Sequence, residues 1–164
     1  MEGFSLNWHF AAHESQLSGK SAIELRHLES LLGEPMMLVS GDEIRCISNV
    51  CTHRGMLLVD GSCSRTTLQC PYHGRTFGLD GSMKSMPEFD LVEGFPAAED
   101  DLRTFPTTSW KGLIFTGLQP SGMEACLGEM ESRVGWMPIE KFEYDNSRNR
   151  CCLLYTSDAA DDLR

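Results

Sequence analysis

Two short stretches of the chain each place a histidine close behind a cysteine. The first reads Cys51-Thr-His53 and the second reads Cys70-Pro-Tyr-His73, and a glycine follows each histidine within two residues. Thiolate and neutral imidazole are strong ligands for transition metals, so the two stretches together offer four donors. Sixteen residues separate His53 from Cys70, which is enough for a hairpin to bring the two stretches side by side.

Two kinds of metal centre use two cysteines and two histidines. In a Rieske 2Fe–2S cluster the cysteines hold one iron and the histidines hold the other. A structural zinc ion takes the same donors, but zinc modules usually pair cysteine with cysteine and histidine with histidine. Each pair here is mixed. The spacing therefore favours a 2Fe–2S cluster held by Cys51, His53, Cys70 and His73, with a zinc-stabilised interaction module as an alternative.

The remaining cysteines do not suggest a disulfide scaffold. The chain has 7 cysteines, an odd number, and its first residues lack the basic start and apolar run of a secretory signal. Cys46 falls in an apolar strand pattern and is expected to be buried. Cys63 is expected to be a free thiol, and Cys126 is expected to pack from a helix.

The elements that must position the two stretches are short strands broken by turn residues. Strand patterns cover residues 34–40, 43–48, 66–69, 76–79 and 111–116, and weaker ones cover 8–13 and 23–26. Gly41-Asp42 between the first two predicts a tight hairpin. Many short strands with turns between them suggest an all-β fold, a small sandwich or barrel.

The second half of the chain contains an acidic stretch and, after it, a helical pattern. Residues 88–101 are acidic and contain proline, so they are expected to form a solvated surface loop. Beyond Pro120, apolar residues recur at helical spacing from Met123 to Met130. This pattern predicts a short C-terminal helix capped near Ser121.

The acidic charge balance excludes several classes of partner. The chain carries 14 Lys and Arg against 24 Asp and Glu, which gives a net charge of -10. Nucleic acids and anionic lipids require a basic footprint, so neither is expected as a partner. No apolar run approaches the roughly 18 residues that a membrane helix needs. We therefore expect no membrane association and a cytoplasmic location.

The region around the two stretches is basic in spite of the acidic whole. Residues 51–75 contain three arginines, Arg54, Arg65 and Arg75, and a single acidic residue. Two interpretations follow. The arginines either receive an acidic electron-donor protein or pair with the acidic loop at 88–101.

The motifs resemble the Rieske domain of ring-hydroxylating oxygenase large subunits. The similarity includes residues 8–17 and 110–117 and extends over about residues 8–150. It leans toward the branch that contains choline- and betaine-type monooxygenases and aromatic ring dioxygenases. Relatives often carry tryptophan after the second His-Gly, where this chain has Arg75. That difference lies outside the four expected ligands.

The resemblance implies a division of the chain and a role for the parent protein. Residues 1–118 would form an all-β Rieske domain of small antiparallel sheets with two cluster-binding hairpin loops. Residues 119–150 would form a short C-terminal helix and connector toward a catalytic domain absent from this sequence. That domain would hold a mononuclear non-haem Fe(II) and hydroxylate an aromatic or small organic substrate with dioxygen, as a mono- or dioxygenase. The present chain would be inactive alone.

The resemblance also implies partners. A ferredoxin or flavin reductase would donate electrons, and the full-length protein would form a homotrimer or an α3β3 assembly. A stand-alone Rieske ferredoxin is the alternative, although such carriers usually lack an extension like 119–150. Residues 151–164 resemble the translated end of a sequencing adapter, and we expect them to be a non-native tail.

Overall fold

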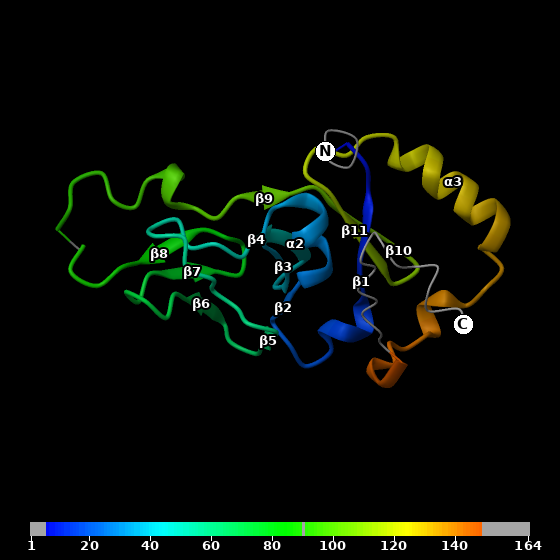
Figure 1. The fold of residues 1–164 in the computed structure, drawn as a ribbon, viewed down its shortest axis with the longest axis horizontal. Helices are drawn as coiled ribbons and strands as arrows, with labels where there is room; N and C mark the ends of the chain where they lie inside the picture. The colour runs from blue at the N-terminus through cyan, green and yellow to red at the C-terminus, as the bar shows by residue number, and fades with distance from the viewer. Residues whose placement is uncertain (1–5, 90, 149–164) are drawn as a thin grey trace, which may run out of the picture.

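The computed structural model describes residues 6–89 and 91–148, and the expected tail at 151–164 lies outside them. Three small antiparallel sheets follow one another along an elongated molecule, and a C-terminal helix lies at one end (Figure 1). The predicted fold of small antiparallel sheets with a C-terminal helix is confirmed.

The central sheet has five strands and connects the other two sheets. In spatial order its strands are β5 (Ser62–Cys63), β2 (Ala22–Glu24), β3 (Met36–Ser40), β4 (Ile44–Ser48) and β9 (Thr104–Phe105). The hairpin expected at Gly41-Asp42 joins β3 to β4, and Val39 lies opposite Arg45. This hairpin leads directly into the first Cys–His stretch.

The two faces of the central sheet carry separate apolar clusters. Along β3, Met37 and Val39 belong to one cluster, whereas Met36 and Leu38 belong to the other. Successive side chains of a strand point to opposite faces, so β3 contributes to both clusters. All four residues are buried, as expected for a strand that is covered on both sides.

The second Cys–His stretch lies in a separate three-stranded sheet. Its strands are β6 (Thr67–Gln69), β7 (Thr76–Gly78) and β8 (Met83–Ser85). The stretch connects β6 to β7, and Gln69 lies opposite Thr76 at the base of the connection. Phe77 is fully buried beside this base, in the same apolar cluster as Cys51 and Cys70. The hairpin placement of the stretch was predicted correctly.

The third sheet closes the opposite side of the domain. It consists of β1 (His9–His13), β11 (Leu113–Thr116) and β10 (Thr107–Trp110), with β11 in the middle. The turn between β10 and β11 needs positive φ at both Lys111 (48°) and Gly112 (81°). A Cβ atom on Gly112 would lie 2.8 Å from Nε2 of His13, so glycine allows this turn to pack against β1.

One helix was not predicted. Helix α2 (Arg26–Leu32) follows β2 directly, so the expected strand at 23–26 ends early, at Glu24. The helix has 7 residues and buries only Leu28, which is too little to give a periodic apolar pattern. Gly33 ends it in the left-handed conformation, with φ of 70°.

The predicted C-terminal helix is α3 (Met123–Val134), with two corrections. Its N-cap is Gly122, and no side chain caps it, so Ser121 does not have the expected role. None of its residues is buried, and Cys126 is exposed instead of packed. The apolar residues of α3 are only partly covered because the helix rests on one edge of the third sheet (Figure 1).

Polar contacts attach α3 to the turn between β10 and β11. Nε1 of Trp110 donates to Oε2 of Glu131 over 2.9 Å, and Nζ of Lys111 donates to the carbonyl of Gly135. The described residues also include short 3-10 helices at Glu14–Leu17, Ala98–Asp100, Ile139–Lys141 and Asn146–Arg148. In the described part of the chain, no helix has the length and apolar character needed to span a bilayer.

Phe77 tests the packing on which the second loop depends. Replacing Phe77 with Ala removes a fully buried ring, and we expect the free energy of unfolding to fall by about 3–5 kcal/mol in urea titrations. Leu91→Ala is the matched control, because Leu91 is 98% exposed. An unchanged stability of the Phe77 variant would contradict this account of the core.

Candidate metal centre

The first Cys–His stretch folds into a tight loop, residues 51–56, which we call the first loop. The backbone N–H of Cys51 donates to the carbonyl of Met56 over 2.8 Å, and that of Gly55 donates to the carbonyl of Cys51 over 3.0 Å. Gly55 has φ of 68°, a value that glycine adopts without steric cost. The backbone therefore closes around the position of the cysteine.

The second loop, residues 70–75, repeats this pattern. The N–H of Cys70 donates to the carbonyl of Arg75 over 2.7 Å, and that of Gly74 donates to the carbonyl of Cys70 over 3.0 Å. Gly74 also has positive φ, 75°. A Cβ atom there would lie 3.1 Å from Cγ of Pro87, so a larger residue would press on this proline as well as strain the turn.

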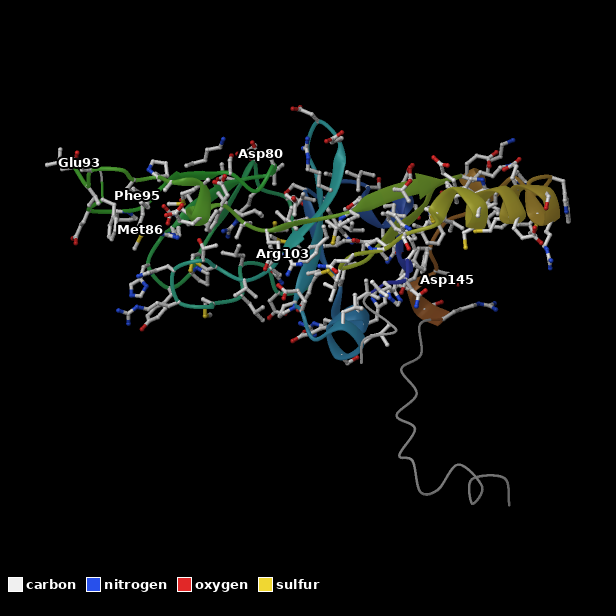
Figure 2. The ribbon with its side chains drawn as sticks, turned by 90° about the horizontal axis from the view of Figure 1, so that it is seen from above. Asp80, Met86, Glu93, Phe95, Arg103 and Asp145 are labelled. Atoms are coloured by element: carbon white, nitrogen blue, oxygen red, sulfur yellow. The ribbon has the colours of Figure 1, made fainter. Side chains whose placement is uncertain are left out.

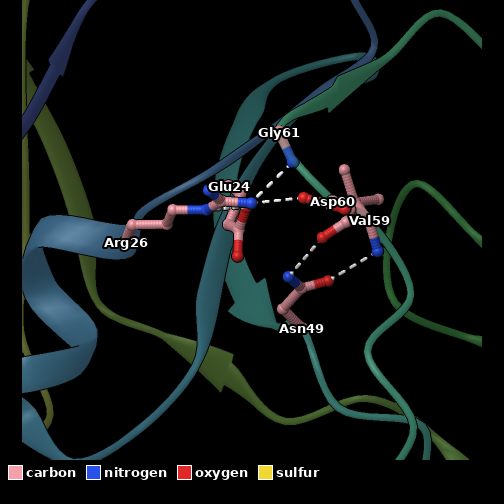
Figure 3. Close-up of polar contacts among 6 residues, drawn as sticks. All are labelled: Glu24, Arg26, Asn49, Val59, Asp60 and Gly61. Carbon is pink, nitrogen blue, oxygen red and sulfur yellow. Dashed lines mark hydrogen bonds and ion pairs between the residues drawn. The ribbon is translucent and has the colours of Figure 1, made fainter.

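A buried asparagine closes the base of the first loop. Nδ2 of Asn49 donates to the carbonyl of Val59 over 2.8 Å, and the N–H of Val59 donates to Oδ1 of Asn49 over 2.9 Å (Figure 3). The N–H of Leu58 donates to the backbone carbonyl of Asn49 over 3.1 Å. The asparagine side chain thus acts like a strand partner and joins the two ends of the loop.

The chain that leaves the first loop is also attached to β2. A carboxylate oxygen of Glu24 accepts from the N–H of Gly61 and from Nε of Arg26, each over 2.8 Å (Figure 3). Arg26 pairs with Asp60 as well. The Arg26 side chain is 68% exposed, so its ion pairs add little stability. The bond from Gly61 to the Glu24 carboxylate, together with the bond from the Glu24 N–H to the Gly61 carbonyl over 2.8 Å, fixes this segment of the backbone.

The fold brings the predicted ligand residues of the two loops together, cysteine beside cysteine and histidine beside histidine. Cys51 and Cys70 are buried, with 2% and 3% of their surface exposed. The rings of His53 and His73 are half-buried, and their centroids lie 4.8 Å apart at an angle of 62°. The thiols therefore lie inside the domain, and the imidazoles lie between them and the surface.

The surroundings of these groups change their acidity. Burial raises the pKa of the Cys51 thiol, and the neighbouring Cys70 raises it further, while the backbone amides of His53 and Arg54 oppose the change. Loss of hydration lowers the pKa of His53, and the nearby His73 and Arg54 add to this effect. The imidazole is thereby kept in the neutral form that binds metals.

One ring nitrogen in this group has no partner. Nδ1 of His73 is buried and makes no hydrogen bond in the structure. The ring of Tyr72 lies against the His73 ring, with centroids 3.7 Å apart. A buried polar atom without a partner costs about 1–3 kcal/mol, so this nitrogen is suited to a metal ion. The donor set and its unpartnered atom fit a Rieske 2Fe–2S cluster.

The arrangement does not suit a single ion. Among residues 6–89 and 91–148, no three Cys, His, Asp or Glu side chains are grouped so that they could hold one metal ion. A structural zinc site needs four donors about 2.0–2.3 Å from one centre. A two-iron cluster instead needs one pair of donors at each iron. The two cysteines are neighbours, and so are the two histidines, which is the pairing that a two-iron cluster requires.

Comparison with known proteins supports the same centre. Residues 7–96 match the family described as "Rieske [2Fe-2S] domain". The chain belongs to this family. The carnitine monooxygenase oxygenase subunit of Acinetobacter baumannii is 30% identical to this Rieske chain over 118 residues, which are 70% of the chain and 31% of that protein. The chloroplastic choline monooxygenase of Beta vulgaris is 31% identical over 121 residues, 72% of the chain and 26% of that protein.

Solved structures show the same fold. A quaternary ammonium Rieske monooxygenase superposes on the chain with a TM-score of 0.70 and 29% identity, over 81% of the chain and 37% of that structure. Naphthalene 1,2-dioxygenase from Rhodococcus sp. superposes with a TM-score of 0.66 and 28% identity, over 78% of the chain and 30% of that structure. This Rieske chain therefore spans about a third of the length of its relatives.

For one of the three arginines, the structure decides between docking of an electron donor and pairing with the acidic loop. Arg75 is buried and pairs with Asp100 over 3.0 Å, so for this residue the pairing with the acidic loop is correct. Arg54 and Arg65 are exposed. Within the acidic loop, Leu91 is exposed as expected, but Asp100 turns toward the Rieske loops.

Asn49 is the residue that sequence reasoning missed. We expect Asn49→Ala to lower the free energy of unfolding by about 2–4 kcal/mol, because it leaves the N–H and carbonyl of Val59 unpaired in the core. Urea unfolding of the iron-free chain measures the change. Asn146→Ala serves as the control, since Asn146 is exposed. Equal stability of both variants would show that the asparagine does not hold the loop.

Two of the cysteines outside the loops, Cys46 and Cys126, have opposite surroundings. Burial raises the pKa of Cys46 to about 12, whereas Cys126 is exposed. Because the thiolate is the reactive form, we expect iodoacetamide at about pH 8 to label Cys126 and to spare Cys46 until the chain unfolds. Peptide mass spectrometry distinguishes the two sites. Labelling of Cys46 in the folded chain would contradict its position in the core.

Proposed function

We propose that Cys51 and Cys70 hold one iron of a 2Fe–2S cluster and that His53 and His73 hold the other. The observation that carries this proposal is the buried and unpartnered Nδ1 of His73, beside a second imidazole and two buried thiols. We infer from it that His73 binds through Nδ1. When bound, such a cluster accepts and releases one electron at a time.

The two cysteines and the two histidines would have different roles in the centre. The buried cysteines keep water from the sulfur side, and the amides of His53 and Arg54 near the Cys51 sulfur favour its charged form. Neutral imidazoles add no negative charge, which makes an added electron easier to accept than with four thiolates. Because the imidazoles lie nearest the surface, they offer the shorter route for an electron.

We further propose that the chain is the N-terminal part of an oxygenase large subunit. The support is its relationship to carnitine and choline monooxygenases, whose length it covers only in part. The cluster would take electrons from a ferredoxin or flavin reductase and pass them to a mononuclear non-haem Fe(II) in the remaining part of the protein. In those relatives the named substrates are quaternary ammonium compounds, so a small organic cation is the substrate class we favour over an aromatic ring.

The segment after residue 118 supports the oxygenase over a stand-alone ferredoxin. It forms α3, and the following turn contacts the domain through the carbonyl of Ile139, 3.4 Å from Nε2 of His13. A carrier protein has no evident need for this attached extension. The division at residue 118, the trimeric or α3β3 assembly and the cytoplasmic location remain predictions.

Ligand substitutions test the centre. Loading the purified chain with iron and sulfide under anaerobic conditions should give a visible absorption band and, after reduction, an electron paramagnetic resonance signal. We expect the single variants Cys51→Ser, Cys70→Ser, His53→Ala and His73→Ala to lose the reducible cluster, because each removes one of four required donors. Cys126→Ser should load like the parent chain. A colourless parent chain, or normal loading of any ligand variant, would contradict the assignment.

A further inference from the structure

A buried arginine lies immediately beside the proposed ligands. Arg75 ends the second loop, two residues after His73, and only 5% of its surface is exposed. Burying a guanidinium group is costly unless partners satisfy its charge and its N–H groups. Nη1 of Arg75 donates to Oγ1 of Thr52 over 2.6 Å, and Nη2 donates to Oδ1 of Asp100 over 3.0 Å.

The first of these contacts joins the two loops directly. Thr52 stands between Cys51 and His53 in the first loop. A side-chain bond from Arg75 to Thr52 therefore connects the middle of one loop to the end of the other. The backbone bonds described above close each loop on itself, so they do not fix the distance between the loops.

Asp100 completes a triangle of contacts. The hydroxyl of Thr52 donates to the backbone carbonyl of Asp100 over 2.7 Å, and the second carboxylate oxygen accepts from the N–H of Ala97 over 2.9 Å. All three groups, Arg75, Thr52 and Asp100, are thus bonded to one another. The carboxylate compensates the charge of the guanidinium, and its own position is fixed by the turn at Ala97.

An aromatic ring covers the remaining side of the guanidinium. The Arg75 group lies 5.6 Å from the centre of the Phe95 ring, and Phe95 contacts Phe89 at 5.1 Å between centroids. Phe95 lies with Met86 at the end of the molecule remote from α3 (Figure 2). Nε of Arg75 is buried without a partner, so the group depends on its two terminal nitrogens for its orientation.

We propose that Arg75 is a positioning residue that braces the two loops, through Thr52 and Asp100, at the separation that the four ligands need. The inference rests on the proposed cluster, because binding of a cluster is what requires the two loops to stay at a fixed distance. The planar guanidinium can bond two acceptors in fixed directions, which suits it to this task. Thr52, Arg75 and Asp100 contact the loops and do not bind iron themselves.

A double-mutant cycle tests the brace. The variants are Thr52→Val, which removes the hydroxyl at nearly constant size, Arg75→Met, and the two combined. Bleaching of the visible band in the presence of an iron chelator gives the rate of cluster loss. We expect about a tenfold faster loss for Arg75→Met and a several-fold faster loss for Thr52→Val. The double variant should lose the cluster more slowly than the product of the two single effects predicts, because both changes break the contact between Arg75 and Thr52.

Two further variants separate the brace from a general loss of charge or stability. Arg65→Met removes an equal charge from an exposed residue that lies between the two loops in the sequence. This variant should lose the cluster at the parent rate. Arg75→Lys keeps the charge but can reach only one of the two partners, so it should restore part of the retention. Pulsed paramagnetic resonance should show altered histidine nitrogen couplings in Thr52→Val and unchanged ones in Arg65→Met.

The outcomes distinguish this inference from the proposed function. Parent-like retention in Thr52→Val, or effects that multiply in the double variant, would overturn the brace while the cluster stands. A parent chain that stays colourless would instead overturn the cluster. In that case the same double-mutant cycle is measured by urea unfolding of the full iron-free chain. Non-additive losses in the free energy of unfolding show that Arg75 and Thr52 are coupled and support the brace. Additive losses refute it.

Discussion

The whole arrangement depends on holding two separate loops so that donors from both face one small volume. In the proposed centre, each loop supplies one cysteine and one histidine, and neither loop can complete the centre alone. Two thiols are buried there, and a histidine nitrogen is buried without any partner in the protein. The thiols pack in an apolar interior without penalty, but the unpartnered nitrogen is costly to bury, and a metal centre that binds it would remove that cost.

The rest of the fold supplies the supports for this geometry. The central sheet carries the first loop on β4, and the small sheet of β6, β7 and β8 carries the second. An apolar cluster between the two sheets contains Cys51, Cys70 and Phe77. Asn49 then closes the first loop at its base, and we infer that Arg75 sets its distance from the second. The third sheet and α3 lie on the other side of the central sheet from β6, β7 and β8 (Figure 1).

Local patterns in the sequence were sufficient for the ligand loops and for the longer strands, whereas β5, β8, β9 and β10 were not predicted. The hairpin at Gly41-Asp42 and the connection from β6 to β7 follow from turn residues between short apolar runs, and the mixed Cys–His spacing indicates the cluster. Features that depend on tertiary contacts were missed. Helix α2 buries a single residue, so its sequence shows no periodic apolar pattern. Helix α3 has such a pattern, but none of its residues is buried. The roles of Asn49 and Arg75 depend on residues distant in the sequence.

The most direct test is a crystal structure of the iron-loaded chain, with diffraction data collected at the iron absorption edge. Anomalous scattering locates iron independently of any assumption about the ligands. We predict two iron peaks, one beside Cys51 and Cys70 and the other beside Nδ1 of His73 and the ring of His53. A single peak surrounded by all four side chains, or iron bound elsewhere, would contradict the account.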